Sequence, residues 1–577
     1  MKSNLKSVFL VIIASLLISA SSFGQEKRPD FVNNREYPQW FKDAKLGIFI
    51  HYGLYSIPSW SGKEQYAEWF YKGLISGDTA RIEFQKKVFG ENFKYEDYKD
   101  IFKAEMFNAD DWADLFEKSG AKFVLFTSKH HDGYCMWGSK YAKGWNSVET
   151  GPKIDFCQEL TDAVRKKGLE MGMYYSLTEW TNPLYRWTID TNITIERYTT
   201  EHLIPQFKEM VERFKPSVIF SDGDWDHSYK DFHSDELVDF YYKTVGKKGI
   251  VNNRFGDGFK HGYLTPEYSA GIIESSQPWS ECRGIGRSFG LNRNEDLETY
   301  KSSDEIIKHF VQLVAGGGGL TLNVGPSADG QIPLLQQERL LDLGAWLNIN
   351  KEAIYGSKPY QKPYDEKEST AIVYYDSVID FNWVRNSPIK PVSEDNFKVK
   401  WEGEITPKFS EKYTISCQAD DYAIVYLNDK LIIDTRNKIN SYNITLSKGE
   451  NYNMLIDYHE TDLEASISLN WQSKSQAKEP INAKWNATYT WNKTYVCYTT
   501  NQSNLYAISY SIPKDNLILK LNTSPKKDMK VSFLDNPDLV IPWEYKNGNL
   551  IINTSNIKYS DVKSKSSFVF KLQDYLK

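Results

Sequence analysis

The feature that most constrains the fold is an alternation of short apolar runs with helical patterns between residues 46 and 324. The runs are rich in β-branched and aromatic residues, as expected for strands that are buried on both faces. They lie at Leu46–His51, Phe123–Phe126, Met171–Tyr175, Val218–Phe220, Ile250–Val251 and Leu320–Val324. This alternation favours an α/β fold with a parallel sheet covered by helices, most simply a TIM-like (β/α) barrel. A doubly wound open sheet is the alternative.

Two of the segments between these runs carry clear helix signals. Asp155 can cap a helix that has Gln158 at its third position, and Gly168 would close that helix. Ser302 and Glu305 form a capping box ahead of a second apolar pattern. Both predicted helices fall where a barrel needs a connection between parallel strands.

After about Tyr355 the pattern changes to short alternating strands separated by turn residues, which is typical of β-sandwiches. Examples are Phe397–Trp401, Tyr413–Cys417, Ile424–Leu427, Tyr442–Leu446, Leu505–Ser511 and Phe568–Leu572. The polar stretch Ser473–Lys478 separates two groups of such strands. We therefore expect a TIM-like barrel at residues 25–360, a first β-sandwich at 375–472 and a C-terminal β-sandwich at 479–577.

The first 24 residues have the pattern of a secretory signal peptide. Lys2 and Lys6 precede the apolar run Val8–Ala20, and small residues then lead to Gly24 and Gln25. The run is shorter than the ~20 residues of a membrane-spanning helix, and no later segment reaches that length. The sequence thus predicts an exported protein, periplasmic or extracellular, that has no membrane span.

Composition excludes several classes of protein. Lys+Arg 70 against Asp+Glu 76 gives a net charge of −6 without a long block of one sign, which argues against nucleic-acid binding. The five cysteines are scattered and lack zinc spacing, and the histidines show no metal-binding motif, so we expect neither a metal nor another cofactor. Aromatic residues reach 15%, and flat rings can hold the C–H faces of sugars as well as pack a core.

In a barrel of this type the reactive groups lie at the C-terminal ends of the strands, because the loops there converge on one mouth. Asp222 follows the predicted strand Val218–Phe220 and precedes Gly223, which makes it the best candidate for a nucleophile. The alternative is that Asp222 only caps a turn before the glycine. A hydrolytic site would need a second carboxyl group from another loop.

Two residues are candidates for this second carboxyl group. Glu267 lies between Pro266, which stiffens the backbone, and Tyr268, which could provide an apolar wall that raises the pKa of a carboxylic acid. Glu281 is the competitor. Each of the two glutamates could instead be an ordinary surface carboxylate.

His51, His130 and His131 all fall at the ends of predicted strands, where neutral imidazoles could donate hydrogen bonds to ligand hydroxyls. Adjacent residues of a strand point to opposite faces, so His130 and His131 can both enter the mouth only if the strand has already ended. Arg254 follows the run Ile250–Val251 and is either a clamp for a ligand or carboxylate or a solvated surface residue.

Nine motifs in order resemble the α-L-fucosidases of glycoside hydrolase family 29. They are Phe41–Gly53, Ala67–Phe70, Ser128–Gly133, Lys153–Asp155, Gly172–Ser176, Ser221–Gly223, Thr265–Tyr268, Arg283–Gly290 and Leu322–Pro326. The resemblance spans roughly residues 36–355 together with a C-terminal β segment. No single motif is diagnostic, but their joint order is specific to the family.

The resemblance implies a retaining double displacement in which Asp222 is the nucleophile and Glu267 is the acid/base. Retention requires two carboxyl groups about 5–5.5 Å apart. Many relatives have Glu directly after the Trp that corresponds to Trp279, whereas this chain has Ser280 there, which favours Glu267 over Glu281. The positions that match the fucose pocket are His51, Glu68, Trp69, His130, His131, Tyr174, Arg254 and, beside the C5 methyl group, Phe289.

The segment Tyr375–Gln472 resembles a β-sandwich of the protective-antigen type, which implies a carbohydrate-binding module. Its Asp420 and Asp421 could bind calcium together with a sugar, or only form a turn. The expected function is that of an exo-acting retaining α-L-fucosidase whose partner is a fucosylated glycan. A non-catalytic glycan-binding protein and a retaining glycosidase for another sugar are the alternatives. Linkage, aglycone and oligomeric state depend on loop shape and surface pairing, which a sequence does not specify.

Overall fold

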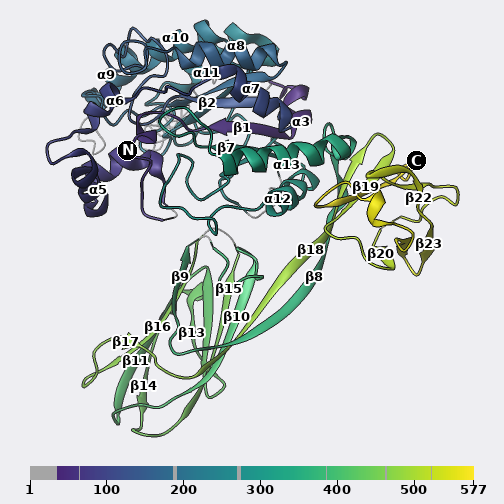
Figure 1. Ribbon diagram of the computed structural model, residues 1–577. Coiled ribbons are helices and arrows are strands. Elements are labelled where there is room, and N and C mark those ends of the chain that lie inside the picture. Colours follow the sequence, from purple (N-terminus) through teal and green to yellow (C-terminus); the bar gives the residue numbers. More distant parts are fainter. Residues whose placement is uncertain are drawn as a thin grey trace, which may run out of the picture.

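The computed structural model describes residues 35–577, except for 64, 186–191, 270–274, 385, 462–463 and 522. The predicted signal peptide at residues 1–24 lies outside the described residues. Figure 1 shows a helix-covered barrel, an elongated β module on one side of it, and a second β module near the C-terminus. The predicted fold class, a TIM-like barrel followed by β-sandwich modules, is confirmed as a parallel barrel-like sheet followed by antiparallel β modules.

A seven-stranded parallel sheet forms the barrel wall, in the order β5-β4-β3-β2-β1-β7-β6. Its strands are β1 Leu46–Ile50, β2 Phe123–Lys129, β3 Glu170–Ser176, β4 Val218–Asp222, β5 Ile250–Val251, β6 Ser280–Gly284 and β7 Gly319–Val324. The apolar runs correctly predicted every strand except β6. That strand has the sequence SECRG, so its polar residues hide it from a search for apolar runs.

Residues 263–268 close the gap between β5 and β6. The amide of Tyr263 donates to the carbonyl of Val251 at 3.0 Å, and the amide of Cys282 donates to the carbonyl of Pro266 at 2.9 Å. Parallel bridges join this segment to both neighbouring strands. The segment therefore occupies the position of an eighth strand, and it carries Glu267 into the ring.

Helices cover the outside of the sheet (Figure 1). The longer ones are α5 Thr79–Phe89, α7 Ala109–Lys118, α8 Phe156–Lys166, α10 Ile204–Phe214, α11 Ser234–Val245, α12 Ser303–Ala315 and α13 Leu334–Asn350. Shorter ones are α3 Gln39–Ala44, α4 Phe70–Ser76, α6 Tyr98–Ile101 and α9 Asn192–Tyr198. Both predicted caps are present, because Asp155 accepts from the amide of Gln158 at 2.9 Å and Ser302 accepts from that of Glu305 at 3.2 Å.

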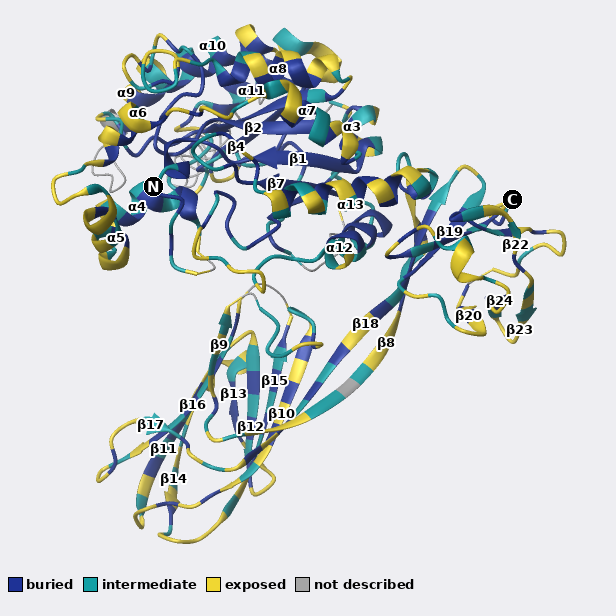
Figure 2. Cartoon of the chain, viewed as in Figure 1, coloured by how far each residue is buried: buried dark blue, intermediate teal, exposed yellow. Residues whose placement is uncertain are grey.

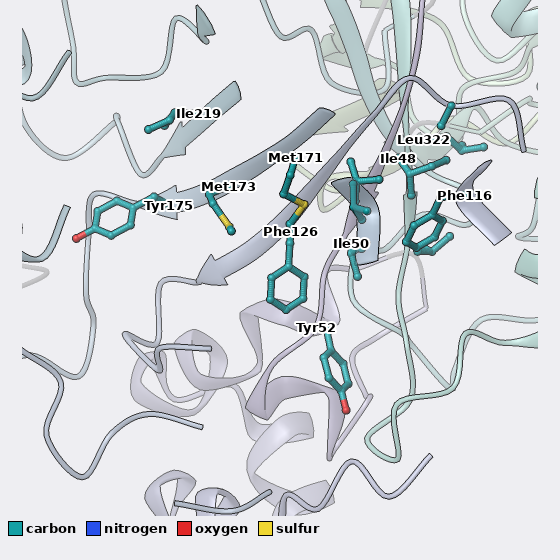
Figure 3. Close-up of a cluster of buried hydrophobic side chains, with 14 of the residues drawn as sticks. Ile48, Ile50, Tyr52, Phe116, Phe126, Met171, Met173, Tyr175, Ile219 and Leu322 are labelled. Atoms are coloured by element: carbon teal, nitrogen blue, oxygen red, sulfur yellow. The ribbon is translucent and has the colours of Figure 1, made fainter. Parts of the chain in front are cut away.

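Residues of the strands alternate between two cores. On the outer face, Ile48 of β1 and Ile219 of β4 pack with the helices, in the cluster that Figure 3 shows. On the inner face, Phe49 and Phe220 pack inside the barrel. Because side chains alternate along a strand, Asp222, two residues after Phe220, has its side chain on the inner face at the strand's C-terminal end.

Two long antiparallel strands, β8 Lys358–Asp376 and β18 Trp485–Asn501, connect the barrel to the β modules (Figure 1). Residues 486–491 of β18 pair with β10, and residues 496–501 pair with β19. One strand thus belongs to both modules. The polar stretch Ser473–Lys478 runs from the last residue of β16 to β17 and does not separate two modules as expected, because β16 and β17 are paired strands of the first module.

We call the first module, β9 to β17 with the first half of β18, the insertion module. Its strands are β9 Asp380–Val384, β10 Phe397–Ile405, β11 Glu411–Asp420, β12 Tyr422–Leu427, β13 Lys430–Asp434, β14 Ser441–Leu446, β15 Tyr452–Glu460, β16 Ala465–Ser473 and β17 Glu479–Pro480. Alternate residues of these strands are buried, which gives the striped pattern of Figure 2. The buried rows meet in a core of their own that includes Trp401, Tyr458 and Trp485.

The C-terminal module packs a core of its own between two antiparallel sheets. Its strands are β19 Asn504–Ser509, β20 Asn516–Leu519, β21 Val531–Phe533, β22 Asn536–Val540, β23 Trp543–Lys546, β24 Asn549–Asn553 and β25 Phe568–Leu572. Among the described residues of the whole chain, no helix combines the length and the apolar character that crossing a membrane requires.

Candidate active site

Asp222 is surrounded by three donors at the C-terminal end of β4. Arg254 approaches its Oδ1 at 3.1 Å, and the Tyr174 hydroxyl donates to its Oδ2 at 3.0 Å. His131 Nε2 lies 3.5 Å from the same Oδ2. Burial alone would raise the pKa of Asp222, but His131 and Arg254 outweigh it and hold the pKa well below the usual range. The carboxylate is therefore ionised.

Arg254 connects Asp222 to the second carboxyl group. One terminal nitrogen of its guanidinium contacts Asp222, and the other lies 3.1 Å from Oε2 of Glu267. The hydroxyl of Tyr66 donates to Oε1 of Glu267. Asp222 and Glu267 thus face the same guanidinium, and neither is turned away from the other.

Both carboxyl groups line one small cavity of about 120 Å³ in the barrel mouth. Of the predicted sugar-binding residues, His51, Glu68, Trp69, His130, Tyr174, Arg254 and Phe289 line it as well. His131 is fully buried behind Asp222. The structure therefore brings all ten predicted site residues together and places nine of them on the cavity.

The two adjacent histidines occupy different positions because β2 ends at Lys129, before either of them. His131 Nδ1 lies 2.6 Å from the hydroxyl oxygen of Ser176, which orients its other nitrogen toward Asp222. His130 lines the cavity, and its Nδ1 is buried without a hydrogen-bond partner in the described part of the chain. Burial also lowers the pKa of His130 well below its usual value, so this imidazole is neutral.

Neighbouring segments fix two further cavity residues. His51 Nδ1 lies 2.7 Å from the side-chain oxygen of Asn323, whose amide donates to the carbonyl of Phe289. Burial lowers the pKa of His51 to about 4, although the bond to Asn323 opposes this shift. One polar chain thus orients both a neutral imidazole and the aromatic wall of the cavity.

Glu68 is a third carboxyl group on the cavity, and it has no cationic partner among the described residues. Its Oε2 accepts from the amide of Gly290 at 2.8 Å and from the hydroxyl of Ser288 at 3.2 Å. Burial raises the pKa of Glu68 to about 7, and the bond from Gly290 limits the rise. The carboxyl group can therefore donate or accept hydrogen bonds near neutral pH.

Glu281, the competing acid/base candidate, faces away from the cavity. Along β6, Cys282 lines the cavity, so the alternating side chains of Glu281 and Arg283 point to the outer face. There Glu281 is fully buried, 3.4 Å from Arg283 and 2.9 Å from His309 of α12. It belongs to a closed ion cluster that has no access to a ligand.

Sequence reasoning missed several residues of the cavity. Phe49, Tyr66, Phe220, Trp225 and Cys282 also line it. Strand alternation from Asp222 would have indicated Phe220, and Tyr66 immediately precedes the Ala67–Phe70 motif. No group of three or more His, Cys, Asp or Glu side chains with metal-binding geometry is found among the described residues.

Comparison with protein families gives three matches that together span most of the chain. Residues 14–352 match the model described as alpha-L-fucosidase. Residues 355–485 match the PA14 domain, and residues 490–573 match the alpha-L-fucosidase C-terminal domain.

Curated relatives and solved structures agree with these matches. The chain is 40% identical over 365 residues to an alpha-L-fucosidase of Dictyostelium discoideum, covering 61% of this chain and 78% of the relative. It is 36% identical over 341 residues to human plasma alpha-L-fucosidase, covering 57% of this chain and 72% of the relative. A solved Thermotoga maritima alpha-fucosidase in complex with a mechanism-based inhibitor superposes with a TM-score of 0.63 at 27% identity, covering 95% of this chain and all of that one.

Proposed function

The chain belongs to the α-L-fucosidase family, glycoside hydrolase family 29, and on that premise we propose that Asp222 and Glu267 carry out a retaining hydrolysis of terminal α-L-fucosides. The observation that carries this assignment is the pairing of both carboxyl groups with the single guanidinium of Arg254. A retaining glycosidase needs one ionised and one protonated carboxyl group on opposite sides of the bond that breaks.

In the first step an oxygen of Asp222 forms a bond to the anomeric carbon of fucose while the bond from that carbon to the leaving oxygen breaks. Glu267 gives its proton to this oxygen, so that an alcohol departs. His131 and Arg254 keep Asp222 ionised in the free enzyme, and the Tyr174 hydroxyl donates a hydrogen bond to it. The product of this step is a fucosyl ester on Asp222.

In the second step Glu267, now a carboxylate, removes a proton from water. The water oxygen attacks the anomeric carbon, the ester bond to Asp222 breaks, and fucose leaves with its original anomeric configuration. Both proton transfers use Glu267, so its contact with Tyr66 matters in each of them. The Thermotoga maritima relative was solved in complex with a mechanism-based inhibitor.

The lining of the cavity suits a 6-deoxy sugar. Phe49, Phe220 and Phe289 provide an apolar wall for a methyl group, whereas His51, His130 and Glu68 offer polar atoms to hydroxyls. His130 in particular has a buried nitrogen that lacks a partner within the described residues. Buried polar atoms are rarely left unpaired, so a ligand hydroxyl is the expected partner.

Turnover of two matched substrates tests this proposal. L-Galactose differs from L-fucose by one hydroxyl on the C5 substituent, so we compare 4-nitrophenyl α-L-fucoside with 4-nitrophenyl α-L-galactoside. We expect a kcat/KM for the fucoside that is roughly 10- to 100-fold higher, because an apolar pocket penalises a buried hydroxyl. Equal rates would point to another sugar, and no turnover of the fucoside would leave only a binding protein.

We further propose that the mature protein is exported, which is supported by the N-terminal pattern of Lys2, Lys6 and Val8–Ala20. One of the curated relatives is a plasma protein by name. N-terminal sequencing of the protein recovered outside the cytoplasm should give a chain that begins near Gln25. Recovery of the whole chain only from the cytoplasmic fraction would refute the proposal.

A further inference from the structure

A second and larger cavity adjoins the catalytic one. It has a volume of about 410 Å³, against about 120 Å³ for the catalytic cavity. The barrel contributes Tyr66, Trp69 and Tyr268 to its lining, and the insertion module contributes Val384 and Glu464. We call this space the outer cavity. Here two residues of the insertion module come close to the catalytic loops.

Tyr66 and Trp69 line both cavities, so the two spaces share a wall. The hydroxyl of Tyr66 also donates to Glu267, the proposed acid/base. Because the acid must face the leaving oxygen, the leaving group departs on the side of Glu267 and Tyr66. Tyr66 lines the outer cavity as well, so the outer cavity is the neighbouring space on that side.

Ion pairs hold the insertion module at the barrel mouth. Arg287, which also lines the outer cavity, donates to the side-chain oxygen of Asn386 at 2.7 Å and lies 3.3 Å from Glu394. Lys301 lies 2.9 Å from the same glutamate. Burial alone would raise the pKa of Glu394, but Lys301 and Arg287 outweigh it and lower the pKa to about 2. The pairs therefore persist across the usual pH range, and Figure 1 shows β9 reaching toward the barrel at this point.

We infer that the outer cavity binds the sugar to which fucose is attached, and that Val384 and Glu464 of the insertion module are part of this aglycone site. The inference rests on the proposed fucosidase function. It makes the module a determinant of specificity, because one wall of the active site comes from a part of the chain outside the barrel.

The chemistry of the lining fits a pyranose ring. Tyr66 and Trp69 contribute aromatic rings to the lining, which can pack against C–H groups, and Val384 adds an apolar side chain. The exposed carboxylate of Glu464 can accept hydrogen bonds from ring hydroxyls or from an acetamido N–H. The volume falls within the roughly 300–1,000 Å³ that is typical of ligand pockets.

Two variants of the full-length enzyme test the inference. Glu464→Ala removes the acceptor, and Val384→Lys places a long charged chain at the edge of the cavity. Glu404→Ala is the matched control, because Glu404 is an exposed glutamate near the opposite end of the same module, where β10 pairs with the start of β15. The substrates are α-L-fucosyl fluoride, whose leaving group is too small to reach the outer cavity, and a panel of fucosyl disaccharides linked to galactose or N-acetylglucosamine.

For the disaccharide that the wild type cleaves best, we expect kcat/KM to fall roughly 10-fold or more in Glu464→Ala and Val384→Lys. Hydrolysis of the fluoride should stay within about twofold of the wild type, and the control should match the wild type on both substrates. If kcat/KM for the disaccharide and hydrolysis of the fluoride are both unchanged in the two variants, or both fall by the same factor, the inference is overturned. The fucosidase function then remains intact. Hydrolysis of the fluoride without cleavage of any disaccharide would also overturn it. Failure of the wild type on the fluoride itself would instead count against the proposed function.

Discussion

Two clusters of acidic and cationic side chains lie on opposite faces of the same barrel wall. The inner one joins Asp222 and Glu267 through Arg254, and the outer one joins Glu281 to Arg283 and His309. Both are largely buried. They differ in access, because the inner carboxylates line a cavity whereas the side chain of Glu281 is 0% exposed under α12.

The charge balance of the two clusters also differs. In the inner cluster two carboxyl groups share one guanidinium, so the site can accept positive charge that develops on a substrate. In the outer cluster one carboxylate faces an arginine and a histidine, so its charge is already matched. Burial and charge alone therefore do not identify the catalytic site. What distinguishes the catalytic cluster is an excess of carboxyl groups that line a cavity.

The largest expected effect is that of Asp222→Gly, which removes the nucleophile. We expect kcat to fall roughly 10⁴- to 10⁶-fold, as for the loss of a nucleophile in other covalent mechanisms. Added azide should restore turnover by occupying the vacated space and should yield a fucosyl azide, which mass spectrometry detects. Asp224→Asn, which changes a carboxylate on the same loop that does not line the cavity, serves as the control. Full activity of Asp222→Gly would reject the inner cluster as the catalytic one.

Glu267→Ala should have the next largest effect, and the effect should depend on the leaving group. For alkyl fucosides, which need protonation, we expect a loss of roughly 10²- to 10⁴-fold in kcat/KM. Activated aryl fucosides leave without an acid, so their kcat/KM should fall far less. A plot of rate against the pKa of the leaving group should therefore become steep in this variant. A slope like that of the wild type would remove Glu267 from the role of acid.

Glu281→Ala should give the opposite result, with a loss of stability and no change in that slope. The substitution leaves the buried guanidinium of Arg283 without its carboxylate, and breaking a buried pair costs roughly 3–5 kcal/mol. Calorimetry should show a lower melting temperature for the barrel. If the rate of Glu281→Ala instead depended steeply on the pKa of the leaving group, Glu281 rather than Glu267 would be the acid.

The sequence predicted the inner cluster better than the outer one for a physical reason. Asp222 follows the apolar run of β4, so strand alternation and the rule that barrel sites lie at strand ends both point to it. Glu281 and Arg283 lie in β6, whose five residues contain no apolar run. Because β6 is not recognisable as a strand, the alternation of side chains along a strand could not be applied to it. The direction of these side chains could therefore not be deduced.

The strand-like segment that carries Glu267 was also not predicted from the sequence. This segment, residues 263–268, joins the barrel through a few backbone bridges rather than a long ladder, so local periodicity did not reveal it. The contact between the insertion module and the barrel could not be predicted either. The module's strands were predicted from their alternation, but the contact between Arg287 and Glu394 joins residues 107 positions apart, and no local pattern specifies such a pair.

Glu68 is buried like Glu281 but has only neutral hydrogen-bond donors, Ser288 and Gly290. Burial raises its pKa in the folded protein from 4.5 to about 7. A raised pKa means that the folded state binds the proton more tightly than the unfolded state. The contribution of Glu68 to stability is therefore fully present below pH 4.5 and is lost as the pH rises to about 7.

The variant Glu68→Gln, which cannot ionise, should lack this pH dependence. A shift of this size corresponds to a loss of about 3 kcal/mol at most in the wild type. Measured by calorimetry from pH 5 to pH 8, the barrel of the wild type should thus lose stability relative to Glu68→Gln. A constant difference between the two proteins over this range would mean that Glu68 is ionised throughout. In that case the barrel would tolerate a buried carboxylate without a cation as readily as the paired Glu281.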